Sequence, residues 1–156
     1  MGKLVAEEGP VHREYAAQRL ADAWGLRRAG SRVIGAVGEA VQICMKKGLI
    51  RIVGDFLWPP GLRDVGVRVP VSGEPFSFRR IEYIPPEEIE GAMRLVVHHA
   101  MSLSAESLLT ETARIFGFDR TGSRITTRLL EIYKRLLEKG ELVSHGGIVS
   151  LPKSRQ

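Results

Sequence analysis

The sequence has one cysteine among its 156 residues, which excludes an internal disulfide framework and a cysteine-based zinc site. That residue, Cys44, lies on an apolar helical stripe. No apolar run approaches the roughly 20 residues that a membrane-spanning helix needs. The N-terminus also lacks the basic-then-apolar order of a signal peptide. Together these absences predict a cytoplasmic protein with no membrane partner.

An internal duplication organises the chain. The run Gly25–Val33 is answered by Gly117–Ile125, and Lys47-Gly48 is answered by Lys139-Gly140 at the same offset. Sliding the sequence on itself at that offset aligns about fifty residues without a gap and gives about a dozen identities. The chain therefore contains two copies of one supersecondary unit.

Each copy combines helices with a β-hairpin. Apolar residues recurring three and four apart predict helices over residues 12–24, 31–47, 85–101, 104–116 and 123–139. Ser31 and Ser123 are interpreted as N-caps. Short β-prone runs around Gly54-Asp55 and Gly146-Gly147 predict hairpins. This order of elements predicts an α+β fold, mainly α, of two tandem winged-helix-like units, each a helix-turn-helix with a hairpin wing.

The predicted boundaries follow from the repeat. The first unit covers residues 1–60, with a leading helix that is short or missing, and the second covers residues 86–152 before a tail at 153–156. Residues 61–85 connect them. Val65, Val67, Val69 and Val71 lie two apart in that connection, which predicts strand-like segments and not a bare tether.

Positive charge gathers around the last helix of each copy. The formal net charge is +5 and the isoelectric point is near 9.7, which permits an anionic partner. The candidate nucleic-acid-binding residues of the second copy are Arg120, Arg124, Thr127, Arg128, Lys134 and Arg135. A weaker patch in the first copy comprises Arg27, Arg28, Lys46 and Lys47. The corresponding outer helix face of the first copy is small and smooth, which suits packing against protein.

These side chains also have a purely structural interpretation. Arg32 and its counterpart Arg124 could contact phosphate or could pair with the shared Glu14 and Glu106. The outward face of the last helix could be a solvated surface with ion pairs from Arg128 to Glu131 and from Arg135 to Glu138.

Three stretches together resemble a known family. They are Gly117–Ile125, Asp55–Pro59 and Arg80–Ile89. The chain resembles an uncharacterised domain near the C-terminal end of large bacterial superfamily-one helicase-related proteins, which also carry a restriction-endonuclease-like domain. The resemblance covers almost the whole chain. It implies an accessory module of a larger protein and supplies no active-site residues.

No catalytic constellation can be assembled from the sequence. The adjacent His98 and His99 point about 100° apart on a helix, which does not suit a shared metal ion. The turn Gly25–Gly30 lacks the lysine and hydroxyl pair of a phosphate loop. Neither Cys44 nor the serines have the surroundings of an activated nucleophile. We therefore expect no enzyme activity, no cofactor and no metal.

The leading hypothesis is a non-catalytic module that binds the backbone of DNA, mainly duplex DNA, for the helicase or nuclease domains of its parent protein. The alternative is a protein–protein interaction or dimerisation scaffold without direct DNA contact. A homodimer is compatible with either hypothesis.

Overall fold

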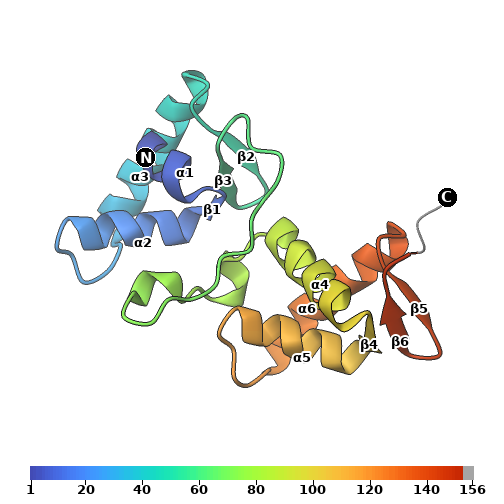
Figure 1. The fold of residues 1–156 in the computed structure, drawn as a ribbon. Coiled ribbons are helices and arrows are strands. Elements are labelled where there is room, and N and C mark those ends of the chain that lie inside the picture. The colour runs from blue at the N-terminus through green and yellow to red at the C-terminus, as the bar shows by residue number, and fades with distance from the viewer. Residues whose placement is uncertain (153–156) are drawn as a thin grey trace. The chain divides into compact units, whose positions relative to one another are not determined.

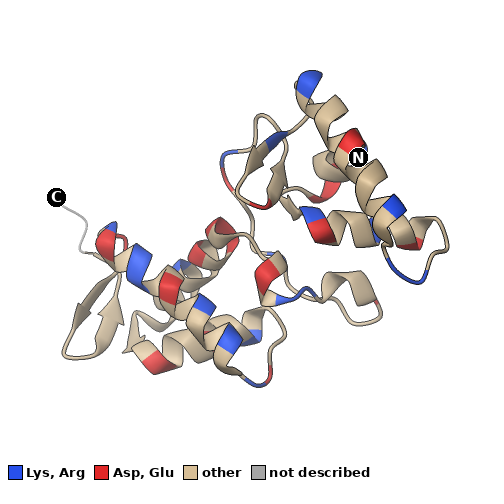
Figure 2. Ribbon diagram, turned by 180° about the vertical axis from the view of Figure 1, so that it is seen from behind, with Lys and Arg blue, Asp and Glu red and all other residues tan. Residues whose placement is uncertain are grey.

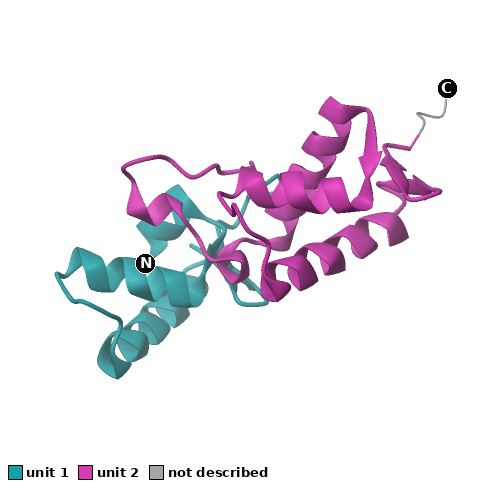
Figure 3. Ribbon diagram, turned by 90° about the horizontal axis from the view of Figure 1, so that it is seen from below, with its two compact units in different colours: residues 1–65 teal, residues 66–156 magenta. Residues whose placement is uncertain are grey.

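The chain forms two compact units in a computed structural model that describes residues 1–152. Unit 1 spans Met1–Val65 and unit 2 spans Gly66–Gln156, and Figure 3 shows them in different colours. The tail expected at residues 153–156 lies outside the described residues.

The elements follow the same order in both units (Figure 1). Unit 1 contains α1 (Gly2–Glu8), β1 (Val11–His12), α2 (Arg13–Ala23), α3 (Ser31–Lys46), β2 (Arg51–Val53) and β3 (Phe56–Trp58). Unit 2 contains the 3-10 helices η1 (Pro75–Ser77) and η2 (Ile81–Tyr83), followed by α4 (Pro86–Ala100), β4 (Ser102–Ser104), α5 (Ala105–Ile115), α6 (Ser123–Glu138), β5 (Val143–His145) and β6 (Ile148–Ser150). The predicted α+β, mainly α fold of two winged-helix-like units is confirmed.

Each wing has three strands where the sequence predicted two. The extended step before the second helix of each unit joins the hairpin as an outer antiparallel strand, so the strand orders are β1-β3-β2 and β4-β6-β5. Leu103 pairs with Val149 in unit 2, and Val11 pairs with Leu57 in unit 1. A two-residue or three-residue step has too little alternation to predict this pairing, which depends on the hairpin already being in place.

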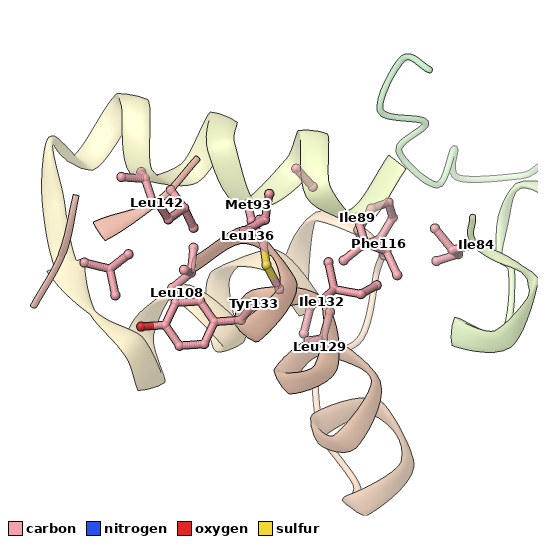
Figure 4. Packing of buried hydrophobic residues seen from close by; sticks show 14 of the residues in the cluster. Ile84, Ile89, Met93, Leu108, Phe116, Leu129, Ile132, Tyr133, Leu136 and Leu142 are labelled. Atoms are coloured by element: carbon pink, nitrogen blue, oxygen red, sulfur yellow. The ribbon is translucent and has the colours of Figure 1, made fainter. Parts of the chain in front are cut away.

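The core of unit 2 lies between its three long helices (Figure 4). On α6, Leu129, Ile132, Tyr133 and Leu136 are buried at helical spacing, so one stripe of the helix faces the core. α4 packs against both α5 and α6. Four charged residues of α6 are exposed to solvent, namely Arg124, Glu131, Lys134 and Glu138.

The two serine N-caps predicted from sequence are wrong. α3 and α6 begin at Ser31 and Ser123, but the N-cap positions are Gly30 and Gly122, which make no side-chain cap hydrogen bond. The serines already have helical backbone and cannot reach back to cap. By contrast, Ser104 does cap α5, because its hydroxyl accepts a hydrogen bond from the Ser107 backbone N–H at 3.1 Å.

The strand-like segments predicted between residues 61 and 85 are also wrong. The structure describes this whole stretch and contains turns, extended coil, η1 and η2 there, but no strand. Side chains take the backbone hydrogen bonds that a neighbouring strand would make: the Arg68 backbone N–H donates to Glu88, and that of Val71 donates to Ser77 Oγ at 2.7 Å. The alternating valines therefore lack a partner strand.

Glu88 ties this stretch to the start of α4. Its fully buried carboxylate accepts two hydrogen bonds from Arg79, at 2.9 and 2.7 Å, and one from the Arg68 backbone N–H at 2.8 Å. The Arg68 guanidinium adds donors at 2.6 and 3.1 Å. Burial by itself raises the pKa of Glu88, but the hydrogen bonds and charges of the two arginines outweigh it and lower the pKa below its ordinary value.

The lowered pKa of Glu88 predicts an acid-sensitive unit 2. A carboxyl whose pKa is lower in the folded chain than in the unfolded chain binds protons more readily in the unfolded chain. At pH values above the ordinary glutamate pKa of about 4.3, its ionised form therefore stabilises the folded state in full. The stabilisation is lost as the pH falls from there through the lower folded pKa. We expect the free energy of unfolding of unit 2 to fall over this range, measured by urea titrations at several pH values. Equal pH dependence in a Glu88→Gln variant would contradict this assignment.

Candidate nucleic-acid interface

The candidate interface is built on α6 and the loop before it. α6 follows α5 through a turn at Gly117, whose positive φ of +80° would strain any residue with a side chain. A Cβ at this position would lie 3.0 Å from Pro70 Cγ. Figure 2 shows basic and acidic residues along α6, whereas α3 is mostly uncharged between its ends. The loop carries Arg120, and α6 carries the other five candidates of the second copy.

A shallow hollow of about 370 Å³ opens beside the first half of α6. η2 forms one wall with Ile81 and Glu82, and α6 forms the other with Ser123, Arg124, Thr127, Arg128 and Glu131. The structure thus brings three of the predicted residues, Arg124, Thr127 and Arg128, into one site. Glu82 was missed because it lies in the stretch interpreted as a linker, and no local sequence signal connects it to α6.

The two arginines of the hollow are only loosely paired. Arg124 Nη1 lies 3.5 Å from Glu82 Oε1, and Arg128 Nη1 lies 3.7 Å from Glu131 Oε2. The Arg124 side chain is 81% exposed, and exposed pairs of this kind contribute about 0–1 kcal/mol. The Nε of Arg128 is buried without a hydrogen-bond acceptor in the described chain. An anionic oxygen could therefore replace the Glu82 carboxylate beside Arg124 at little cost.

Two further cations extend this surface. Arg120 in the loop and Lys134 on α6 are both exposed, and neither has an ion-pair partner among residues 1–152. Lys134 lies on the same helix as Arg124 and Arg128, about two to three turns along it. We call Arg120, Arg124, Arg128 and Lys134 the α6 cation row.

Arg135 has a different environment from that row. Its Nε donates a hydrogen bond of 2.8 Å to Glu90, which is 6% exposed and also accepts one from Lys139 Nζ at 2.9 Å. Arg135 therefore pairs with α4 and not with Glu138, its expected partner. Likewise Arg124 pairs with Glu82 and not with Glu106. Among the sequence-based alternatives, the structure contains the Arg128–Glu131 pair.

The first-copy candidates do not form one patch. Arg27 and Arg28 lie in the loop before α3, whereas Lys46 and Lys47 lie at its C-terminal end. All four are exposed. The 16 residues of α3 separate the two pairs by about 24 Å, since a helix rises about 1.5 Å per residue. A single phosphate could not contact both pairs.

Residues 1–152 contain neither a metal-binding cluster nor a membrane-spanning helix. Nowhere between residues 1 and 152 do three or more His, Cys, Asp or Glu side chains come together in a way that could hold a metal ion. The rings of His98 and His99 meet edge to face, with centroids 5.7 Å apart, and both are exposed. Within the same range, no helix combines the length and the apolar character needed to cross a bilayer.

Comparison with known proteins gives one partial match. Residues 1–34 match a family described as protein of unknown function (DUF3320). The matched region covers α1, β1, α2, the following loop and the first four residues of α3, 31–34. No curated protein and no solved structure matches the chain. The matched family is itself uncharacterised, and the match shows neither an activity nor an association with helicases.

Proposed function

We propose that unit 2 binds the sugar–phosphate backbone of a nucleic acid, in the first place duplex DNA, through the α6 cation row. The main support for the proposal is that these cations have only weak carboxylate partners, or none, within the described chain. Arg124 and Arg128 have only long carboxylate contacts, of 3.5 and 3.7 Å, and Arg120 and Lys134 have no ion-pair partner in the described chain. Phosphate oxygens would provide shorter, charge-assisted hydrogen bonds to the same groups.

The shape of α6 suits this role. Its 16 residues extend over about 24 Å, and a helix of that size can lie against a DNA groove. Thr127 lies between the two arginines of the hollow and adds a hydroxyl donor for phosphate. Arg135 is a weaker candidate, because the buried Glu90 already accepts its Nε hydrogen bond.

The wider setting is an accessory one. We propose that the chain is a non-catalytic module that holds nucleic acid for helicase or nuclease domains of a parent protein, without a cofactor of its own. The support for this setting is the resemblance of the three sequence stretches, Gly117–Ile125, Asp55–Pro59 and Arg80–Ile89.

A salt series tests the nucleic-acid proposal. Fluorescence anisotropy of a labelled duplex should show binding whose log K falls linearly with log salt between about 50 and 200 mM, because bound cations release condensed counterions. If all four members of the cation row contact phosphate, the slope is about −3 to −4. Changing the duplex sequence should change little, since phosphate contacts do not read bases.

The same titration can reject the proposal. Absence of binding at the lowest salt, or binding that does not respond to salt, would rule out a phosphate-contacting surface. A labelled single strand of equal length provides the comparison. Tighter binding to the single strand would replace duplex DNA by single-stranded nucleic acid as the ligand.

A further inference from the structure

Apolar side chains are exposed together in the stretch of unit 2 before η2. Val69, Val71, Phe76 and Phe78 all lie within residues 69–78, and the two phenylalanines are 41% and 55% exposed. A single exposed apolar residue is ordinary on a protein surface, whereas a concentration of such residues is typical of a binding surface. The groups around this stretch indicate which kind of ligand would cover it.

Phe78 is held in place by its neighbours on both sides along the chain. The hydroxyl of Ser77 accepts a hydrogen bond of 2.7 Å from the Val71 backbone N–H. On the other side, Arg79 donates hydrogen bonds of 2.9 and 2.7 Å to the buried Glu88. A ring whose backbone is already fixed loses little conformational entropy when a ligand covers it. The exposed ring of Phe78 is therefore a preorganised contact surface.

The ring lies beside the loop that leads into α6. Its Cε1 and Cδ1 atoms are 3.5 and 3.6 Å from the position that a Cβ at Gly117 would have. The Cα of Arg120 is within about 11 Å of the Gly117 Cα, because three residues of extended chain span no more than that. Arg80, two residues after the ring, is exposed and has no ion-pair partner in the described part of the chain. An aromatic face and two guanidinium groups without ion pairs therefore lie near one another.

The same stretch leads from Phe78 to the hollow beside α6. Glu82, four residues after the ring, is 3.5 Å from Arg124 Nη1. Four residues of extended chain span at most about 14 Å, so the backbone at Phe78 lies within that distance of Glu82. A nucleic-acid strand held by the α6 cation row can therefore also reach the ring.

We propose that Phe78 stacks on an unpaired base at the end of a duplex whose phosphates are held by the α6 cation row. The inference rests on the proposed nucleic-acid binding by unit 2 and defines the ligand more closely, as a junction between double-stranded and single-stranded nucleic acid. Bases inside a duplex have both faces covered by neighbouring bases, so a ring at the protein surface stacks only on an unpaired base. Arg80 and Arg120 contact the phosphates that flank this base.

The charges around the ring favour nucleic acid over a protein partner. Arg80 and Arg120 lie on either side of the route from the ring to the cation row, and neither has an ion-pair partner among residues 1–152. A ligand that covers this surface should therefore supply both flat apolar faces and several negative charges. Nucleic acid combines the two along one strand, because every base has an aromatic face and every linkage a phosphate.

The test compares labelled DNAs by fluorescence anisotropy with the full chain at low salt. The probes are a blunt duplex, the same duplex with a short single-stranded overhang at its 5′ or 3′ end, and the overhang-bearing strand alone. Stacking of one base on an aromatic side chain changes affinity by about 5- to 150-fold. We therefore expect one of the two overhang duplexes to bind at least about tenfold more tightly than the blunt duplex.

Two substitutions at Phe78 separate stacking from charge. Phe78→Leu keeps an apolar side chain beside Gly117 but removes the aromatic face, so the ratio of the overhang to the blunt affinity should fall by about tenfold. Phe78→Tyr is the matched control, since it keeps the ring and should keep the ratio. The overhang adds the same phosphates for all three chains, so a difference between their ratios reports stacking and not counterion release.

Several results would overturn the inference. Equal affinity of the unaltered chain for blunt and overhang duplexes, a comparison that needs no variant, would show that no base covers the ring and that a protein partner is the better occupant. An equal ratio for Phe78→Leu and the unaltered chain would likewise reject stacking. Either result leaves phosphate binding by the α6 cation row in place. A strand that binds alone as tightly as the overhang duplex would reject the junction, and absence of binding to every probe would reject the proposed function as well.

Discussion

Replacing Glu88 with glutamine is expected to destabilise unit 2 by about 3 kcal/mol, because removing one member of a buried ion pair leaves its partner uncompensated. The side chain of Arg79 is 8% exposed and has Glu88 as its carboxylate partner. The amide of glutamine has one acceptor oxygen where the carboxylate has two, so it cannot accept all the hydrogen bonds that Arg68 and Arg79 donate. It also carries no charge to balance the two guanidinium groups. Arg68, which is more exposed, would recover part of its hydration.

The two units can be monitored separately in this experiment. Both tryptophans, Trp24 and Trp58, lie in unit 1, so tryptophan emission reports the unfolding of that unit. Far-UV circular dichroism reports the helices of both units. In urea titrations of Glu88→Gln, the dichroism transition should move to lower denaturant while the emission midpoint stays in place.

Glu87→Gln is the matched control for this variant. It removes the same charge from the same first turn of α4 and therefore the same interaction with the helix dipole. Glu87 makes no ion pair within residues 1–152. Equal destabilisation by the two substitutions would show that helix-dipole electrostatics, and not the contacts with Arg68 and Arg79, account for the effect.

Reversing the charge of Arg124 and Arg128 together is expected to weaken duplex binding by about a hundredfold at low salt. Each charge-assisted hydrogen bond to phosphate contributes about 1.5–3 kcal/mol, and about 1.4 kcal/mol corresponds to a tenfold change in affinity. Losing two phosphate contacts should also make the salt slope shallower by about 2. Duplexes of different sequence should lose affinity by the same factor.

The choice of arginines matters for this test. Arg135 also lies on α6, but its bond to Glu90 joins α6 to α4, so its reversal would confound binding with stability. Arg114→Glu is the control, because Arg114 is an exposed arginine of α5 that pairs only with Glu111 in the described chain. An equal loss in the control would indicate an effect of net charge and not of the α6 cation row.

Sequence reasoning succeeded where structure is local or repeated. The helices follow from apolar spacing, as on α6, where Leu129, Ile132, Tyr133 and Leu136 form the buried stripe. The hairpins follow from the glycine turns at Gly54 and Gly146-Gly147, all of which have positive φ. These signals work because hydrogen bonds within one helix or one hairpin join residues that are close in sequence.

The candidate site was predicted only in part. Arg124, Thr127 and Arg128 meet in one hollow, and the spacing on one helix was sufficient to predict that. The other wall of the hollow, with Glu82, was not predictable from that spacing. The roles of Arg135 and Arg124 were likewise left open by the sequence. The structure shows their carboxylate partners to be Glu90 and Glu82, and each pair is more than forty positions apart in the sequence.

By itself, the sequence determined that one helix-and-wing unit was duplicated, which residues of each helix turn inward, and that the later copy carries charge on its last helix. Only the tertiary structure decided which of those charges already have partners, that residues 66–85 are held by a buried carboxylate and not by strand pairing, and that Trp24 is exposed where Phe116 is covered. The physical reason is how far apart in the sequence the interacting residues lie. Helical periodicity and turns depend on neighbours along the chain, whereas burial and ion pairing depend on segments that only the folded chain brings together.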